Sequence, residues 1–198
     1  MATDAKSSAG HPVETMLLAL SCLLVLVSLV LPSGEADGAD RPRLALATKA
    51  IGPPDRLVVP SLGLRAPVVP IEVDTAGVLD PPAAVDTVGW WKRSAEPGAR
   101  RGQTLVTGHA IRDGDGAMDR IGEVEPGDIV RLRAGGQIAQ YRTSKTLVYS
   151  RAEVAENARR LFGQDGGSGQ LVLVTCTDWN GTSYDSNVIV LAEPVRGA

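Results

Sequence analysis

LVLVTC, residues 171–176, is the stretch that most constrains the fold of this 198-residue chain. Five apolar or β-branched residues lead without a break into a cysteine. A short continuous run of this kind is typical of a strand that is buried on both faces. We therefore expect residues 171–175 to form a central strand that delivers Cys176 to its end.

Other short runs with strand character lie between turn residues on both sides of this stretch. Within residues 55–198, only residues 151–161 (RAEVAENARRL) have the pattern of a helix, with Gly163 as its stop. Seven or eight short strands and one helix indicate a mainly β domain that forms a closed or nearly closed barrel. The other expected strands are residues 56–59, 66–73, 103–107, 129–132, 137–148 and 187–192.

The N-terminal quarter of the chain has a different character. Residues 16–31 (MLLALSCLLVLVSLVL) carry no charge, which predicts a hydrophobic helix over 16–32 that is a membrane anchor or an uncleaved signal. Residues 1–15 would then be a cytoplasmic N-terminus, and residues 33–54, rich in Gly, Ala, Asp and Pro, a flexible linker. Residues 55–198 remain as the folded domain. Its placement outside the cell rests on the function argued below and not on flanking charge.

Composition excludes several classes of function. A net charge of −3 and an aromatic content of 4% provide neither a basic surface nor a stacking platform for nucleic acid. Cys22 and His11 fall in or beside the apolar segment, so the domain itself has one cysteine, Cys176, and one histidine, His109. These two residues can form neither an intradomain disulfide nor a Cys/His zinc site. We predict no metal and no cofactor.

Cys176 and His109 each follow a predicted strand, where a rigid scaffold commonly presents reactive groups. An imidazole beside a thiol can stabilise the thiolate and later protonate a leaving amine, which is the chemistry of acyl transfer through a thioester. Each residue alone is equally consistent with a structural role, as a core cysteine or a turn histidine. The residue pattern by itself leaves both interpretations open.

Two sequence motifs resemble those of a known family and favour the catalytic interpretation. TLVTGH (residues 104–109) and LVLVTC (residues 171–176) resemble the signature segments of sortases, which carry the histidine and the nucleophilic cysteine. The resemblance implies a sortase-like eight-stranded β-barrel with one or two short helices, and a catalytic pair of Cys176 and His109. It extends over residues 55–194, and the segments 55–69, 88–98 and 125–132 are similar to class E and F sortases from high-GC Gram-positive bacteria.

Membership of this family implies a cysteine transpeptidase that cleaves a cell-wall sorting signal of the LPxTG type. Cys176 would attack the carbonyl of the signal's threonine, and the acyl group would pass to an amine on a peptidoglycan precursor or a pilin lysine. The N-terminal helix would hold the enzyme in the cell membrane as a single-pass protein with an extracellular catalytic domain.

Two alternatives stay open. The chain could be a catalytically weak sortase-fold module that binds sorting signals without turning them over. It could also be a Cys–His peptidase of another fold that acts on the cell wall, although such enzymes usually place the cysteine before the histidine.

The resemblance fails at one position. Sortases place an arginine near the start of the strand after the cysteine, where it donates to the substrate carbonyl, but residues 177–192 contain no arginine or lysine. Asn187 is our candidate for this role, and Arg112 and Arg142 are alternatives from elsewhere in the chain. The predicted substrate contacts are Thr175, Trp179 and Arg142.

Overall fold

The computed structural model describes residues 49–75, 77–111, 114 and 116–196. The sheet closes into a barrel of eight strands, and one α-helix lies among the described residues together with two short 3₁₀ helices, Pro60–Leu62 and Ile121–Glu123. The elements are β1 (Arg56–Val59), β2 (Leu64–Ile71), β3 (Val88–Trp91), β4 (Gln103–Thr107), β5 (Ile129–Ala134), β6 (Gln137–Ser150), α2 (Arg151–Phe162), β7 (Gln170–Trp179) and β8 (Tyr184–Pro194).

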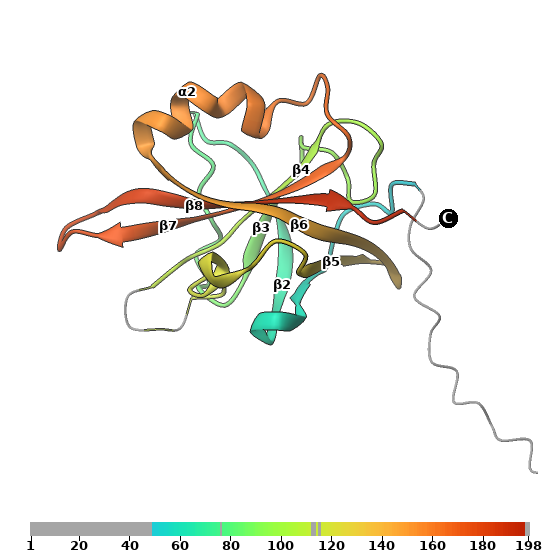
Figure 1. The fold of residues 1–198 in the computed structure, drawn as a ribbon, viewed down its shortest axis with the longest axis horizontal. Coiled ribbons are helices and arrows are strands. Elements are labelled where there is room, and N and C mark those ends of the chain that lie inside the picture. The colour runs from blue at the N-terminus through green and yellow to red at the C-terminus, as the bar shows by residue number, and fades with distance from the viewer. Residues whose placement is uncertain (1–48, 76, 112–113, 115, 197–198) are drawn as a thin grey trace, which may run out of the picture. The chain divides into compact units, whose positions relative to one another are not determined.

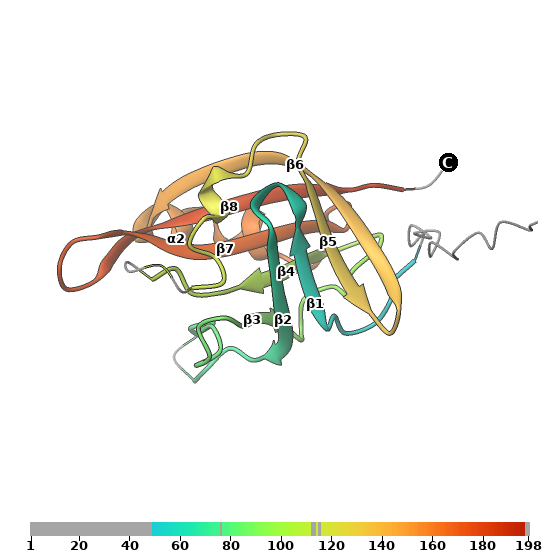
Figure 2. The same ribbon diagram turned by 90° about the horizontal axis from the view of Figure 1, so that it is seen from below.

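Around the barrel the strands follow the order β1-β2-β3-β4-β7-β8-β6-β5. Neighbours are antiparallel except for β2 with β3 and β4 with β7, which are parallel. Parallel neighbours need a long crossover connection. Between β4 and β7 that connection contains β5, β6 and α2, so two segments far apart in sequence become adjacent strands (Figure 1). Figure 2 shows β1 between β2 and β5, and the pairing of β1 with β5 closes the barrel.

Side chains along β7 alternate between two apolar clusters. Leu171 and Leu173 point into the barrel interior with the main core. Val172 and Val174 point to the opposite face, where α2 packs. Burial on both faces is why residues 171–174 are continuously apolar instead of alternating with polar residues. We call the face of β4, β7 and β8 that lies against α2 the outer face.

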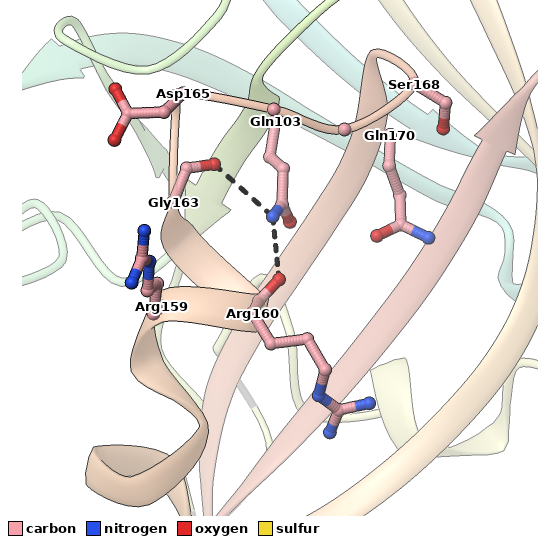
Figure 3. A pocket seen from close by; sticks show the side chains of 9 residues that line it. Gln103, Arg159, Arg160, Gly163, Asp165, Ser168 and Gln170 are labelled. Carbon is pink, nitrogen blue, oxygen red and sulfur yellow. Dashed lines mark hydrogen bonds between the residues drawn. The ribbon is translucent and has the colours of Figure 1, made fainter.

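Helix α2 lies across the outer face and is secured at both ends (Figure 1). At its start the Ser150 hydroxyl accepts a hydrogen bond from the Glu153 backbone N–H, and the Glu153 carboxylate accepts one from the Ser150 N–H, forming a complete capping box. At its end Gln103 Nε2 donates to the main-chain oxygens of Arg160 and Gly163, as Figure 3 shows. A cavity of about 450 Å³ surrounds this second contact.

The closed eight-stranded barrel with one α-helix confirms the expected fold class. The predicted hydrophobic helix over residues 16–32 lies outside the described residues. In the part of the chain that the structure describes, no helix is long and apolar enough to cross a membrane. Ile51, placed by the sequence in the linker, is buried, and its backbone N–H donates to Pro97 O at 3.0 Å.

Two features of the sheet differ from the expected strands. β3 was not expected as a strand; it is four residues long and is held by parallel pairing with β2 and antiparallel pairing with β4. The hairpin of β7 and β8 extends beyond the apolar runs that predicted it, because polar residues on both strands continue the pairing as far as Trp179 and Tyr184.

Candidate active site

Cys176 lies within β7, three residues before the strand ends. It is exposed, and its Cα partner on β8 is Asn187. The sequence placed Cys176 at a strand end, but the hairpin continues past it and is closed by Trp179 and Tyr184, whose ring centroids are 5.0 Å apart. Cys176 continues the alternation of Val172 and Val174, so its side chain belongs to the outer face.

The parallel pairing of β4 with β7 brings His109 to Cys176. The register pairs Thr107 with Val174. It continues past the end of β4, because the Gly108 N–H donates to Val174 O at 3.3 Å and the Thr175 hydroxyl donates to Gly108 O at 2.8 Å. Two residues beyond the last pair, His109 therefore comes opposite Cys176, at the spacing of neighbouring strands, about 4.8 Å. β7 and β8 thus carry Cys176 and Asn187 as paired residues, and the segment that follows β4 brings His109 beside them.

A carbonyl oxygen determines which nitrogen of His109 carries a proton. His109 Nε2 is 2.9 Å from Pro82 O, in the connection between β2 and β3. Because a carbonyl oxygen can only accept a hydrogen bond, Nε2 is the donor in this contact. Nδ1 is then the ring nitrogen that can take up and release a proton during a reaction.

An apolar groove leads along the outer face to these three residues. It encloses about 410 Å³, and its walls come from α2, from the connection between β2 and β3, and from four strands. At one end it reaches Thr107 and Val174, which lie two residues before His109 and Cys176, and Asn187, the register partner of Cys176. The residues of this outer groove are Val73, Gly77, Val78, Leu79, Trp91, Leu105, Thr107, Val154, Phe162, Val174 and Asn187.

The cavity beside Gln103, whose lining Figure 3 shows, contains neither His109 nor Cys176. It reaches β7 at Gln170, six residues from Cys176, which corresponds to about 20 Å along a strand. The outer groove is the cavity that ends beside Cys176, at Val174 and Asn187, and Cys176 itself lines a smaller adjoining depression of about 200 Å³.

Two opposing effects act on the Cys176 thiol. Although the residue is exposed, the surrounding protein removes part of its hydration, and this loss raises the pKa of the thiol above its ordinary value. The positive charge of Arg151 lowers the pKa, but by less than desolvation raises it. The thiolate is therefore a minority species at neutral pH, and a nearby proton acceptor such as His109 is needed to generate it during the reaction.

Comparison with known protein families shows to which family this chain belongs. A family model described as the sortase domain matches residues 57–195. The chain belongs to the sortase family. The match contains both β4 and β7, and with them His109 and Cys176. No curated protein matches the sequence of this sortase.

Solved sortase structures share its fold at low sequence identity. Sortase C-1 from Actinomyces oris is 20% identical, with 72% of this chain and 73% of that chain covered and a TM-score of 0.57. Sortase A from Corynebacterium diphtheriae is 19% identical, with 74% and 62% covered and a TM-score of 0.57. A sortase D5 transpeptidase from Clostridium perfringens is 20% identical, with 71% and 78% covered and a TM-score of 0.53. At such identities the likeness concerns the fold.

The other predicted site residues of this sortase lie in different places. Thr175 is buried, and its hydroxyl holds the backbone just before His109. Trp179 is 41% exposed on the hairpin beyond Cys176. Arg142 pairs with Glu193 near the far end of β8 and donates to Gly127 O, so it is not brought together with Cys176. Arg112 lies outside the described residues.

Sequence reasoning missed two groups that touch or influence the pair. Pro82 O contacts His109, and Arg151 acts on Cys176. No motif marks a carbonyl in a connecting segment. Arg151 was counted only as the first residue of a helix, and the crossover that brings this helix to the outer face is not visible in the local pattern.

We expect alkylation of Cys176 in this sortase to titrate above the range of a free cysteine. Because the pKa of the thiol is raised, the thiolate fraction is small at neutral pH and grows as the pH rises. The rate of reaction with iodoacetamide, assigned to Cys176 by peptide mass spectrometry, would be measured from about pH 6 to about pH 10. A cysteine-containing model peptide is the reference, and a midpoint at or below that of the reference contradicts the prediction.

Proposed function

We propose that this sortase cleaves a peptide sorting signal of the LPxTG type through a thioester on Cys176 and transfers the acyl group to an amine. The observation that carries the proposal is that Cys176 and Asn187 are paired on adjacent strands at the end of the outer groove, where the segment just after β4 brings His109. A nucleophile, an acid–base group and a neutral hydrogen-bond donor on one face are the parts that acyl transfer requires.

In the first half-reaction, His109 Nδ1 takes the thiol proton as sulfur bonds to the threonine carbonyl carbon, and the carbonyl π pair moves onto oxygen. When that pair returns, the bond from carbon to the leaving nitrogen breaks and the imidazolium protonates the released amine. In the second half-reaction an acceptor amine attacks the thioester, His109 removes its proton, and sulfur leaves as thiolate. Pro82 O holds the imidazole through Nε2 during both steps.

The outer groove supports a substrate with apolar side chains before the cleaved bond. Its walls are mostly aliphatic or aromatic, including Val78, Leu105 and Phe162. An extended peptide that lies along the groove can bury its leucine and proline there and bring its threonine carbonyl to Cys176. Apolar burial of this kind provides affinity, and polar groups at the end of the groove provide orientation.

Asn187 is suited to contact the substrate carbonyl or the threonine side chain. It is the register partner of Cys176 and lines the end of the outer groove. Its side-chain amide makes no hydrogen bond to another described residue, so its N–H donors are available to a ligand. We propose it as the neutral donor at this point of β8, and Trp179 as a contact for the residues that follow the cleaved bond.

The proposal includes the cellular location of the reaction. Residues 16–32 would anchor the enzyme in the cell membrane and residues 33–54 would link the anchor to an extracellular domain, where cell-wall sorting signals are met. The segments similar to class E and F sortases support an enzyme of high-GC Gram-positive type. A peptidoglycan precursor and a pilin lysine are both suitable acceptor amines, because the chemistry requires only an unprotonated primary amine.

Trapping the acyl-enzyme tests this function. The full chain would be mixed with an LPxTG-containing peptide in the absence of an acceptor, quenched in acid and analysed by mass spectrometry. We expect a mass increase equal to the peptide up to its threonine, localised to Cys176 and removed by hydroxylamine. Binding of the peptide without any adduct would instead favour a module that holds sorting signals.

A charge in the outer groove should weaken turnover of the peptide. Val78 lines the groove and is 49% exposed, so Val78→Asp should leave the fold intact. Because a carboxylate in an apolar groove must be desolvated when the peptide binds, we expect kcat/KM to fall about 10-fold or more. Initial rates of peptide cleavage over a range of peptide concentrations provide the measurement.

Val148→Asp is the matched control for this substitution. Val148 is 58% exposed and is paired with Val188, on the opposite face of the sheet from the outer groove. We expect its kcat/KM to stay near the wild-type value. Equal losses in the two variants would contradict a role for the outer groove.

A further inference from the structure

Arg151, the first residue of α2, lies beside the strands that carry the site. The preceding residue, Ser150, pairs with Ser186 on β8, one position from Asn187, the partner of Cys176. The guanidinium Nη2 donates to Tyr184 O at 2.9 Å, at the start of β8. A side chain from the crossover is thus held against the same end of the β7–β8 hairpin as Cys176.

The position of Arg151 is unfavourable for the helix itself. A cation in the first turn of a helix is opposed by the positive end of the helix dipole. The capping box between Ser150 and Glu153 is complete without Arg151. The Glu153 carboxylate already accepts from the Ser150 N–H and hydroxyl, and no ion pair of Arg151 occurs among the described residues. Helix stability therefore gives no reason for an arginine here.

Other charged groups near Cys176 do not provide a cation. Asp119, Asp178 and Tyr184 line a shallow depression that also contains Cys176. The Asp119 carboxylate accepts hydrogen bonds from the backbone N–H groups of Ile111 and Gly116. His109 on the β4 side is the acid–base group and becomes neutral when it gives up its proton. Arg151 is the charge that lowers the pKa of Cys176.

We propose that Arg151 is the permanent positive charge of this active site, supplied by α2 because β8 has none. The guanidinium stabilises the Cys176 thiolate and then the oxyanion that forms when sulfur bonds to the substrate carbonyl carbon and the π pair moves to oxygen. It keeps all its protons throughout. Of its five N–H donors one is used on Tyr184 O, which leaves others for the oxyanion. The role in acyl transfer rests on the proposed function, whereas the effect on the thiol does not.

The first test needs no sorting signal. Alkylation of Cys176 by iodoacetamide would be followed against pH in the full chain for the wild type, Arg151→Ala and Arg151→Lys. We expect Arg151→Ala to lower the alkylation rate at neutral pH about three-fold and to move the midpoint of the pH profile upward, because one partly exposed charge shifts a pKa by up to about half a pH unit. Arg151→Lys keeps the positive charge, so it should restore most of the alkylation profile. An unchanged profile in Arg151→Ala overturns the proposal.

Arg159→Ala is the control, because it removes the same charge from the other, exposed end of the same helix. Its alkylation profile should match the wild type. Thermal unfolding should show only a small change of stability in Arg151→Ala, because the loss of the exposed hydrogen bond to Tyr184 O is offset by removal of a cation that the helix dipole opposes. An equal shift in both variants would mean a general effect of net charge and would also overturn the proposal.

A second test addresses the oxyanion. Single-turnover formation of the Cys176 thioester from an LPxTG peptide should slow about 10²-fold in Arg151→Ala, the usual effect of losing one oxyanion donor. Arg151→Lys should recover the thiol titration but only part of this rate, because lysine lacks the planar fork of donors. An unaltered rate in Arg151→Ala removes the catalytic role. If the wild type forms no thioester, the proposed function fails while the alkylation result still stands.

Discussion

Cys176→Ala is expected to abolish thioester formation and transfer completely, while binding of the peptide is retained. The alanine variant has no atom that can attack the carbonyl, and no other cysteine lies among the described residues. Because Cys176 is exposed and lies outside the buried core, its loss leaves no cavity and little change in stability. Adduct formation by mass spectrometry and peptide affinity by calorimetry would be measured on the same preparation.

Measuring adduct formation and peptide affinity on the same preparation separates a loss of catalysis from a loss of binding. An adduct that persists in Cys176→Ala would show that another group is acylated and would contradict the assignment of the nucleophile. Loss of both adduct and binding would mean that Cys176 is needed to shape the site.

His109→Ala is expected to lower the rate of thioester formation from the peptide about 10²–10⁴-fold, the usual contribution of a positioned acid–base group. The loss has two sources, because His109 must accept the thiol proton and then protonate the leaving amine. The pKa of Cys176 is already raised, so without the imidazole only a small fraction of thiolate is present at neutral pH. Single-turnover kinetics would provide the rate.

An activated thioester or aryl ester provides the control for His109→Ala. Its leaving group departs without protonation, so the loss should be clearly smaller than with the peptide and should shrink further as the pH rises. An equal loss with both substrates at every pH would indicate that His109 is only structural. The contact of Nε2 with Pro82 O orients the ring, but the carbonyl cannot replace its proton transfer.

Most strands of the fold were predictable because their sequence pattern is local. The ranges 56–59 and 103–107 coincide with β1 and β4, and the expected helix over 151–161 differs from α2 by one residue. β3 was missed as a strand because its run, VGWW, is only four residues long and contains a glycine, so it depends on pairing with β2 and β4. The hairpin beyond Cys176 was missed because most of its residues are polar and are held by pairing and by the contact of Trp179 with Tyr184.

Within the site, the reactive residue types were visible in the sequence but their surroundings were not. The signatures ending in His109 and Cys176 mark family membership, and the family match covers both. The sequence placed Arg142 on a predicted strand and Arg151 at the start of the predicted helix, and neither position shows which of the two lies near Cys176. Only the register of β6 with β8 separates them, because it pairs Arg142 with Glu193 and brings Ser150, next to Arg151, to Ser186.

The sequence by itself determined the parts: a chain with one cysteine and one histidine in its domain, short strands that must close on themselves, and no cation on the last strand. Only the tertiary structure decided which parts meet. The crossover through β5, β6 and α2 makes β4 and β7 parallel neighbours, which brings His109 beside Cys176, and the alternation of side chains along β7 and β8 turns Cys176 and Asn187 to one face. The same crossover places the start of α2, with Arg151, beside β8, a consequence of chain connectivity that no local stretch of residues contains.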